Sequence, residues 1–167
     1  MRQIGYVVPD LHEAMAYWAS TCGIGPWFYF ERSAFQTFTY NGKRYDGIDL
    51  TVGFANSGEI QLEIIQQRCR TPSMYIDFLA RFPAGGMQHW SSWPVDYQTR
   101  YDAARALGYE VAMEGTHARG PFAYFRNEGP TGAVIEMSEL TAGRKAFFDM
   151  VRDAAVDWDG RNPVRRM

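Results

Sequence analysis

The sequence predicts an α+β fold made of two tandem strand–helix–three-strand modules, with an extra helix at the C-terminus. The first observation is a repeat, because Gln3–Asp10 and His89–Asp96 both begin with a polar side chain able to bind a metal, continue as a mostly apolar strand and reach an aspartate. The second is that Glu63 and Glu136 each interrupt an apolar stretch near the end of one half. Internal repeats mark duplicated structural units, so the two halves are expected to fold alike.

The repeat divides the chain into four parts. The segment Phe82–Gly86 contains a proline and two glycines, and it is the expected boundary between the halves. We expect a first module at residues 1–70, a helical linker at 71–86, a second module at 87–140, and a C-terminal helix and tail at 141–167.

The first module carries clear start and stop signals. Pro9 ends the first strand because it lacks a backbone donor, Asp10 is a helix N-cap, and Gly23 stops that helix. Asn41-Gly42 is a turn signal inside a less regular link. We expect a helix at residues 11–22 and strands at 2–8, 27–31, 50–54 and 59–66.

The linker and second module follow the same logic. Thr71-Pro72 precedes the linker helix, Gly108 stops the helix of the second module, and Thr141 opens the last helix. The basic tail Arg161–Met167 is expected to fray. We expect helices at residues 74–81, 97–107 and 141–156, strands at 88–93, 109–114, 122–126 and 133–137, and a turn at 127–130.

Composition excludes several classes of partner. The chain has 167 residues, 46% of them hydrophobic and 22% charged, and its formal net charge of -2 gives no reason to expect nucleic acid or an anionic membrane. No apolar run approaches the roughly 20 residues of a membrane span, and the N-terminus lacks the features of a signal peptide. We therefore expect a cytoplasmic protein, in which Cys22 and Cys69 stay reduced as buried thiols.

The paired pattern resembles the vicinal oxygen chelate superfamily, which contains glyoxalase I, methylmalonyl-CoA epimerase, the extradiol dioxygenases, and the fosfomycin and bleomycin resistance proteins. The resemblance rests on the paired spacing and on the stretches Tyr6–Leu11, Leu62–Gln66 and Gly86–His89. It implies that each module curls its part of a mixed sheet into a half-barrel around a shared metal site. It also implies a homodimer.

By this resemblance one divalent metal ion would be held by Gln3, Glu63, His89 and Glu136. The physics agrees, because a carboxylate inside an apolar strand is costly to bury unless it is paired or binds a cation. The alternative is that each glutamate lies on a solvent-facing side of its strand and that His89 is a hydrogen-bonded core histidine.

The donor set narrows the chemistry. Three oxygen ligands and one imidazole suit octahedral zinc, nickel, cobalt, manganese or iron(II). An extradiol dioxygenase is disfavoured, because iron(II) oxygenases use two histidines and one carboxylate, and Gln3 stands where the second histidine is expected.

The ligand order resembles that of zinc-using glyoxalase I, which implies an isomerase, epimerase or lyase acting next to a metal-chelated carbonyl. Glu136 would be the main base and Glu63 its partner on the other face of the substrate. Val7 and Gln67 replace an arginine and an asparagine of glyoxalase I, so glutathione is not expected as the substrate or cofactor.

Aromatic residues near the expected cavity predict a hydrophobic or aromatic small-molecule substrate, although core packing alone would also recruit them. His117 is placed over the cavity mouth, or else is a simple loop histidine, and His12 is expected on the surface. The residues predicted to bind substrate are Tyr6, Trp27, Trp90, Trp93, His117 and Tyr124.

Two other functions remain open at this point. The first is a metal-free small-molecule binding protein of the resistance type, which the four metal-capable positions disfavour. The second is an acyl-CoA epimerase, which needs a basic patch for the CoA phosphates, and Arg44, Arg68 and Arg70 are scattered.

Overall fold

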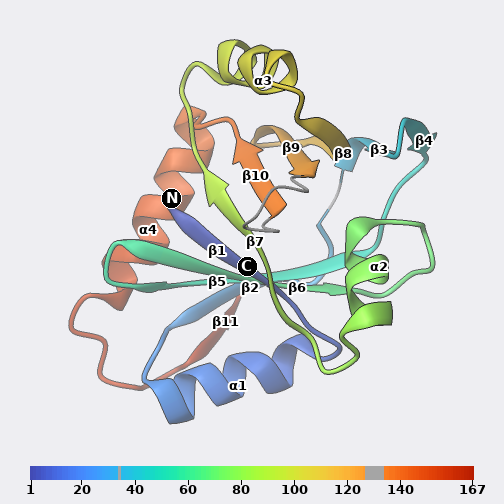
Figure 1. Cartoon of the computed structure of the whole chain (residues 1–167). Helices are drawn as coiled ribbons and strands as arrows, with labels where there is room; N and C mark the ends of the chain where they lie inside the picture. The colour runs from blue at the N-terminus through green and yellow to red at the C-terminus, as the bar shows by residue number, and fades with distance from the viewer. Residues whose placement is uncertain (34, 127–133) are drawn as a thin grey trace.

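The computed structural model describes residues 1–33, 35–126 and 134–167, and it confirms the α+β class with one open mixed sheet and helices packed against it (Figure 1). The helices are α1 (Leu11–Cys22), α2 (Met74–Arg81), α3 (Tyr97–Ala106) and α4 (Ala142–Ala155). The strands are β1 (Gln3–Val7), β2 (Trp27–Phe30), β3 (Phe35–Tyr40), β4 (Lys43–Tyr45), β5 (Leu50–Ser57), β6 (Ile60–Gln67), β7 (Gly86–Ser92), β8 (Glu110–His117), β9 (Gly120–Arg126), β10 (Val134–Ser138) and β11 (Val164–Arg166).

The sheet is arranged symmetrically about its centre. Strands β1 and β7 pair antiparallel there, β6 lies parallel to β1, and β10 lies parallel to β7. Outward from this centre the order is β6, β5, β2 on one side and β10, β9, β8 on the other. The first and last strands of both halves are therefore adjacent, which brings the polar residues of the repeat together.

The link between residues 31 and 50 is more regular than expected. It contains β3 and β4, joined through Asn41 and Gly42, whose positive φ values of 48° and 72° fit the predicted turn. Strand β3 pairs with β8 of the second half, where Phe38 lies opposite Gly115. Its partner is thus far away in the sequence.

The expectation that the tail frays is wrong. Strand β11 pairs parallel with β2, and the backbone N–H of Trp27 donates to Pro163 O at 2.8 Å. Arg166 also forms an ion pair with Glu31. The tail is ordered because it covers the free edge of β2, which would otherwise present unpaired backbone groups.

Helix α1 begins and ends where expected and fixes which way β6 faces. The side chain of Asp10 accepts a hydrogen bond from Glu13 N at 2.9 Å, and Gly23 adopts a left-handed φ of 65°. Buried residues of α1 pack with Leu62 and Ile64 of β6. Since side chains alternate along a strand, Glu63 points to the opposite face.

Helix α4 covers another part of the sheet. Phe147, Phe148 and Val151 of this helix form a buried cluster with Phe28 of β2, and Phe54 of β5 packs against it. The helix therefore adds an aromatic layer beside the face on which Glu63 lies.

Three further expectations concern the two cysteines, the turn after β9 and the character of the helices. Cys22 is exposed and Cys69 is only partly buried, so the prediction of two buried thiols is wrong. The turn predicted at residues 127–130 lies outside the described residues. Across the ranges that the structure describes, none of the helices has the length and apolar character that a membrane crossing requires.

Candidate metal centre

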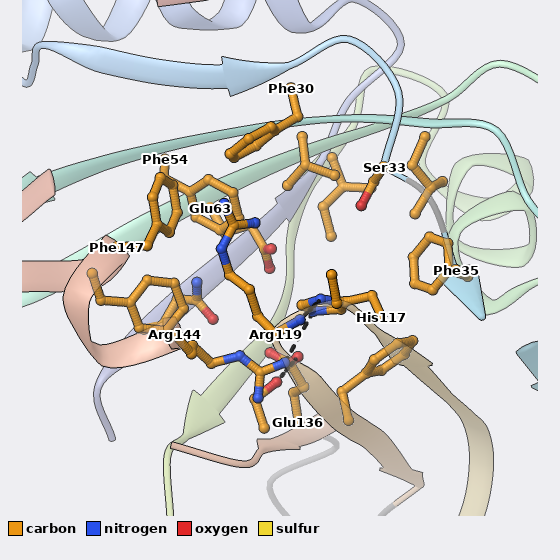
Figure 2. A pocket seen from close by; sticks show the side chains of 18 of the residues that line it. Phe30, Ser33, Phe35, Phe54, Glu63, His117, Arg119, Glu136, Arg144 and Phe147 are labelled. Carbon is orange, nitrogen blue, oxygen red and sulfur yellow. Dashed lines mark hydrogen bonds between the residues drawn. The ribbon is translucent and has the colours of Figure 1, made fainter. Parts of the chain in front are cut away.

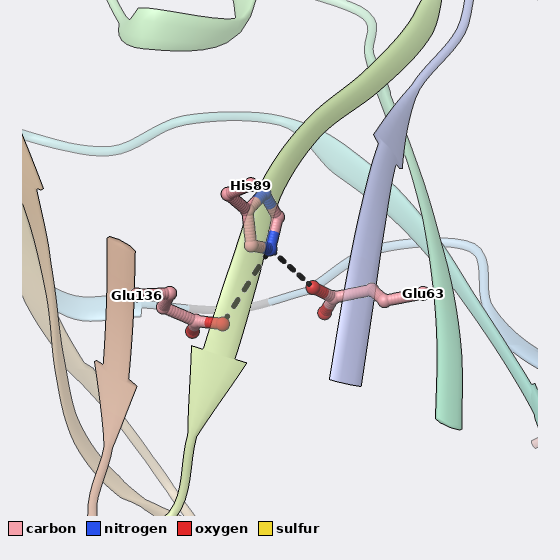
Figure 3. A group of neighbouring side chains, drawn as sticks. All are labelled: Glu63, His89 and Glu136. Atoms are coloured by element: carbon pink, nitrogen blue, oxygen red, sulfur yellow. Dashed lines mark ion pairs between the residues drawn. The ribbon is translucent and has the colours of Figure 1, made fainter. Parts of the chain in front are cut away.

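Glu63, His89 and Glu136 meet at the centre of the sheet, from strands β6, β7 and β10 (Figure 3). His89 Nε2 lies 3.4 Å from Glu63 Oε2 and 3.5 Å from Glu136 Oε2. The exposed fractions of the three side chains are 13% for Glu63, 0% for His89 and 8% for Glu136. The reading in which the two glutamates face solvent is therefore wrong.

Gly5 makes room for the imidazole. It pairs with Glu63 on one side and with His89 on the other. A Cβ atom at Gly5 would lie 1.9 Å from His89 Cε1 and 2.1 Å from Nε2. The histidine ring can occupy this position only because residue 5 has no side chain.

Gln88 fixes the tautomer of His89. Its side-chain oxygen lies 2.6 Å from His89 Nδ1, and because an amide oxygen only accepts, Nδ1 carries the hydrogen. The register of β1 and β7 shifts here, so that Gly5 opposes His89, Tyr6 opposes Met87, and Gln88 has no residue opposite. This bulge lets Gln88 reach the ring of its own neighbour.

Three buried atoms of the centre have no hydrogen-bond partner within the described parts of the chain: His89 Nε2, Glu63 Oε2 and Glu136 Oε2. With hydrogen on Nδ1, all three offer lone pairs to one another. Such an arrangement requires a proton on one of these three atoms or a metal ion among them.

The protonation energetics reflect the same crowding. Burial opposes a charge on His89, but the two neighbouring carboxylates outweigh burial and raise the pKa of His89 to about 9. Burial raises the pKa of Glu63. Burial also acts upward on Glu136, but His89 and the hydroxyls of Ser138 and Ser91 outweigh it and lower the pKa of Glu136.

Gln3 is available as a fourth ligand. It is 2% exposed and lines the same cavity as Glu63 and Glu136. Its Nε2 donates to Gln61 Oε1 at 2.9 Å, which leaves its own amide oxygen for another partner. Two carboxylates, an imidazole and an amide oxygen are a donor set that fits a divalent first-row metal.

A cavity of about 200 Å³ opens above these residues (Figure 2). Glu63 and Glu136 are its acidic residues, and most of its wall is apolar. The aromatic part of the wall consists of Phe30, Phe35, Phe54, Tyr75, Phe122, Tyr124, Phe147 and Phe148. The geometry is that of a small-molecule site, with a few polar groups converging at one place in an apolar pocket.

Comparison with known families agrees with this geometry. The profile of the Glyoxalase/Bleomycin resistance protein/Dioxygenase superfamily matches residues 2–125. The chain belongs to this superfamily. The resemblance seen in the sequence is thereby confirmed. A comparison with curated protein sequences gives no significant match.

Several solved structures share the fold of this chain at low sequence identity. Methylmalonyl-CoA epimerase from Mycobacterium tuberculosis superposes with a TM-score of 0.58 at 16% identity, over 86% of this chain and 89% of that one. A hypothetical protein from Bacillus halodurans gives 0.60 at 14%, over 84% and 94%. A mutant of 4-hydroxymandelate synthase from Streptomyces coelicolor gives 0.58 at 15%, over 83% of this chain and 38% of that one.

Two of the residues predicted to bind substrate, Tyr124 and His117, lie in the wall of this cavity. Tyr124 packs edge-on against the His89 ring, with ring centroids 4.9 Å apart, and its hydroxyl accepts a hydrogen bond from that of Tyr75 at 3.0 Å. His117 Nε2 lies 3.0 Å from Arg144 Nη2. Burial, with Arg144 and Arg119 nearby, lowers the pKa of His117 to about 4.

The four other predicted residues do not line this cavity, which corrects their expected placement. Tyr6 and Trp27 belong to the cluster beneath α1, on the other face of the sheet. Trp90 follows His89 in β7 and so points away from the metal centre. Trp93 stacks on Phe148 at 4.2 Å between centroids. His12 is exposed, as expected.

The basic residues of the cavity were not predicted from the sequence. Arg32, Arg119 and Arg144 all line it. Arg144 is 2% exposed, and its guanidinium donates to Pro121 O and Gly120 O, each at 3.2 Å, and to Glu139 O. An arginine on a helix or in a hairpin turn resembles ordinary surface charge, so spacing alone could not identify these residues.

Proposed function

We propose that this protein is a metal-dependent isomerase, epimerase or lyase that removes a proton from the carbon next to a carbonyl of a hydrophobic small molecule. The observation that carries the proposal is the convergence of His89 Nε2, Glu63 Oε2 and Glu136 Oε2 beside an apolar cavity, all three buried without a hydrogen-bond partner among the described residues. Gln3, Glu63, His89 and Glu136 would hold the ion, which would be zinc, nickel, cobalt, manganese or iron(II). A bound divalent ion would supply Lewis-acid polarisation of the substrate carbonyl.

The carboxylates would move the proton. Ser138 Oγ donates to Glu136 Oε1 at 2.7 Å, which holds that carboxylate in place while Oε2 faces the centre. Glu136 would act as the main base. Glu63 approaches the centre from a strand on the other side of His89, and it would serve the opposite face of the substrate (Figure 3).

The position that receives the proton back would distinguish the reactions. Return to the same carbon gives epimerisation, and return to the neighbouring carbon gives isomerisation. Two carboxylates on two sides of one centre suit delivery to either face. Similarity to a methylmalonyl-CoA epimerase supports the fold needed for such chemistry, at 16% identity.

The second candidate function is metal-free binding of a small apolar molecule. One observation favours it: His89 Nε2 lies 3.4 Å from Glu63 Oε2 and 3.5 Å from Glu136 Oε2. Burial opposes a charge on the ring, but the two carboxylates outweigh burial and raise the pKa of His89 to about 9. A protonated His89 could therefore satisfy both carboxylates without a metal, and the apolar cavity would sequester a ligand unchanged.

Metal analysis separates the two candidates. We expect about one divalent ion per chain in untagged protein that was never exposed to chelator, and none in the double variant Glu63→Ala, His89→Ala. The matched control is His12→Ala, Glu110→Ala, which removes an exposed histidine and an exposed glutamate and should leave metal content unchanged.

If neither parent nor variant holds metal, even after reconstitution with nickel, manganese and zinc, the enzyme proposal is wrong. If the parent does hold metal, solvent deuterium exchange next to the carbonyl of candidate substrates tests the reaction.

A homodimer in the cytoplasm remains our prediction. Light scattering checks the oligomeric state, and cell fractionation checks the location.

A further inference from the structure

Arg119 extends from the turn between β8 and β9 into the cavity (Figure 2). Its guanidinium carbon lies 4.8 Å from the ring centroid of Phe30 and 4.6 Å from that of Phe147. The side chain thus reaches from the second half of the sheet to β2 of the first half and to α4.

The charge of Arg119 has no counterion in the described part of the protein. Ion pairs occupy Arg68, Arg100, Arg152, Arg161 and Arg166, whereas none involves Arg119. Burial lowers the pKa of Arg119, which reflects the cost of desolvating its charge. The two aromatic faces offset part of this cost, because the ring quadrupole attracts a cation placed over it.

The cavity as a whole also favours an anion. Its charged lining consists of two acidic residues, Glu63 and Glu136, and three basic residues, Arg32, Arg119 and Arg144. A divalent ion at the metal centre would neutralise the two carboxylates and leave the arginines uncompensated. The hydrogen-bond donors of Arg144 are already directed at backbone carbonyls and His117, so Arg119 is the better anchor.

We propose that Arg119 binds a carboxylate of the substrate, so that the substrate is a small apolar or aromatic carbonyl compound that is also a carboxylic acid. This inference rests on the proposed function for the metal-chelated carbonyl. Phe30 and Phe147 lie beside the guanidinium and leave N–H donors for an oxyanion, and a guanidinium matches the planar shape of a carboxylate. The cavity of about 200 Å³ suits a compact acid.

The test compares 3-phenylpropanoate with its neutral amide, 3-phenylpropanamide, by isothermal titration calorimetry at low ionic strength. Protein as purified and chelator-treated protein are both titrated, so that direct binding of the acid to a metal is separated from binding to Arg119. The variant is Arg119→Gln. The matched control is Arg165→Gln, since Arg165 also lies over a phenylalanine, at 5.3 Å from Phe28, but does not line the cavity.

We expect Arg119→Gln to weaken binding of the acid at least tenfold in chelator-treated protein and to leave binding of the amide unchanged. Arg165→Gln should bind both as the parent does. Equal affinity of parent and Arg119→Gln for the acid, or no binding of the acid by the parent, overturns the inference. Tighter, Arg119-dependent binding of 2-phenylethylphosphonate also overturns it, in favour of a phosphoryl ligand.

Metal content of the same preparations keeps this test separate from that of the proposed function. Arg119-dependent binding of the acid by a protein that never takes up metal would support the anion site and contradict the metal-dependent reaction. Metal uptake without discrimination between acid and amide would support the metal centre and contradict the anion site at Arg119.

Discussion

Gln88 and His89 are neighbours in strand β7, yet the side-chain oxygen of Gln88 lies 2.6 Å from Nδ1 of the His89 ring. Adjacent residues in a regular strand point to opposite faces, and the bulge at Gln88 breaks that rule. The contact aims His89 Nε2 at Glu63 and Glu136, and it makes Gln88 a positioning residue for the proposed metal.

Replacing Gln88 should therefore weaken metal binding without removing a ligand. We expect Gln88→Leu to lower metal affinity about 10- to 100-fold, the usual effect of losing a hydrogen bond to a ligating histidine. Competition with a chromogenic chelator measures this. Gln88→Glu should retain tight binding, because a carboxylate also accepts from Nδ1. Unchanged affinity in Gln88→Leu would show that the bulge does not orient His89, and the exposed Gln98→Leu is the control.

Gly5→Ala should displace the ring of His89, which packs against Gly5. The new Cβ would lie 1.9 Å from His89 Cε1, so the ring must move. We expect a loss of about 1–3 kcal/mol in the free energy of unfolding, as for other overpacked cores, together with loss of metal binding. Urea denaturation and metal analysis measure the two effects.

Gly143→Ala is the control for that substitution. Gly143 lies in α4, and a Cβ there would meet no atom within 4 Å. Alanine should stabilise the helix by about 0.5–1 kcal/mol. If Gly5→Ala behaves like Gly143→Ala, the packing of His89 against Gly5 is wrong.

Metal addition should stabilise the folded protein. Within the described residues, three buried polar atoms of the centre have no hydrogen-bond partner that a metal ion would displace, and binding to the folded state alone raises the free energy of unfolding. At a free metal concentration one hundred times Kd the gain is about 2.7 kcal/mol. Urea unfolding with and without metal measures it. The Glu63→Ala, His89→Ala variant should show no gain, and an equal gain there would mean that metal binds elsewhere.

His117 should make stability fall in weak acid. Burial, with Arg144 and Arg119, lowers its pKa from 6.5 to about 4, so between these values the unfolded chain binds a proton that the folded chain excludes. The contribution of His117 is fully present above pH 6.5 and is lost as the pH falls towards 4. We expect a loss on the order of 2 kcal/mol across this range, after allowance for partial exposure.

Urea unfolding at pH 4.5 and at pH 7.5 checks this prediction. His117→Gln removes the titrating group, so its stability should change less between the two pH values than that of the parent. The other titrating groups are shared by both proteins and cancel in the comparison. Identical pH dependence in the two would contradict the buried, neutral state of His117.

The sequence predicted the elements whose signals are local. Helix α1 is bounded by Asp10 and Gly23, and both caps act within a few residues of the helix. Strands β3 and β11 were missed because the groups that order them lie far away: β3 pairs with β8, and β11 pairs with β2. Residues within a strand do not identify a partner strand that lies far away in the sequence.

The candidate ligands were predictable because a glutamate inside an apolar strand needs a special reason to be there. Tyr6, Trp27, Trp90 and Trp93 were misplaced because no face of the sheet was assigned to each of them individually. Gln3 faces the cavity, so Tyr6, an odd number of residues later, must face α1. Arg119 carries no comparable signal, because its role depends on Phe30 and Phe147, which come from distant parts of the chain.

The pairing of β3 with β8 has a consequence for synthesis. Phe38 cannot meet its partner Gly115 until most of the second half has been made, so the N-terminal half leaves the ribosome unable to complete its own sheet contacts. Non-local strand pairing of this kind slows folding. A ribosome-bound chain ending at the linker would therefore expose β3, with its phenylalanines, to chaperones and proteases.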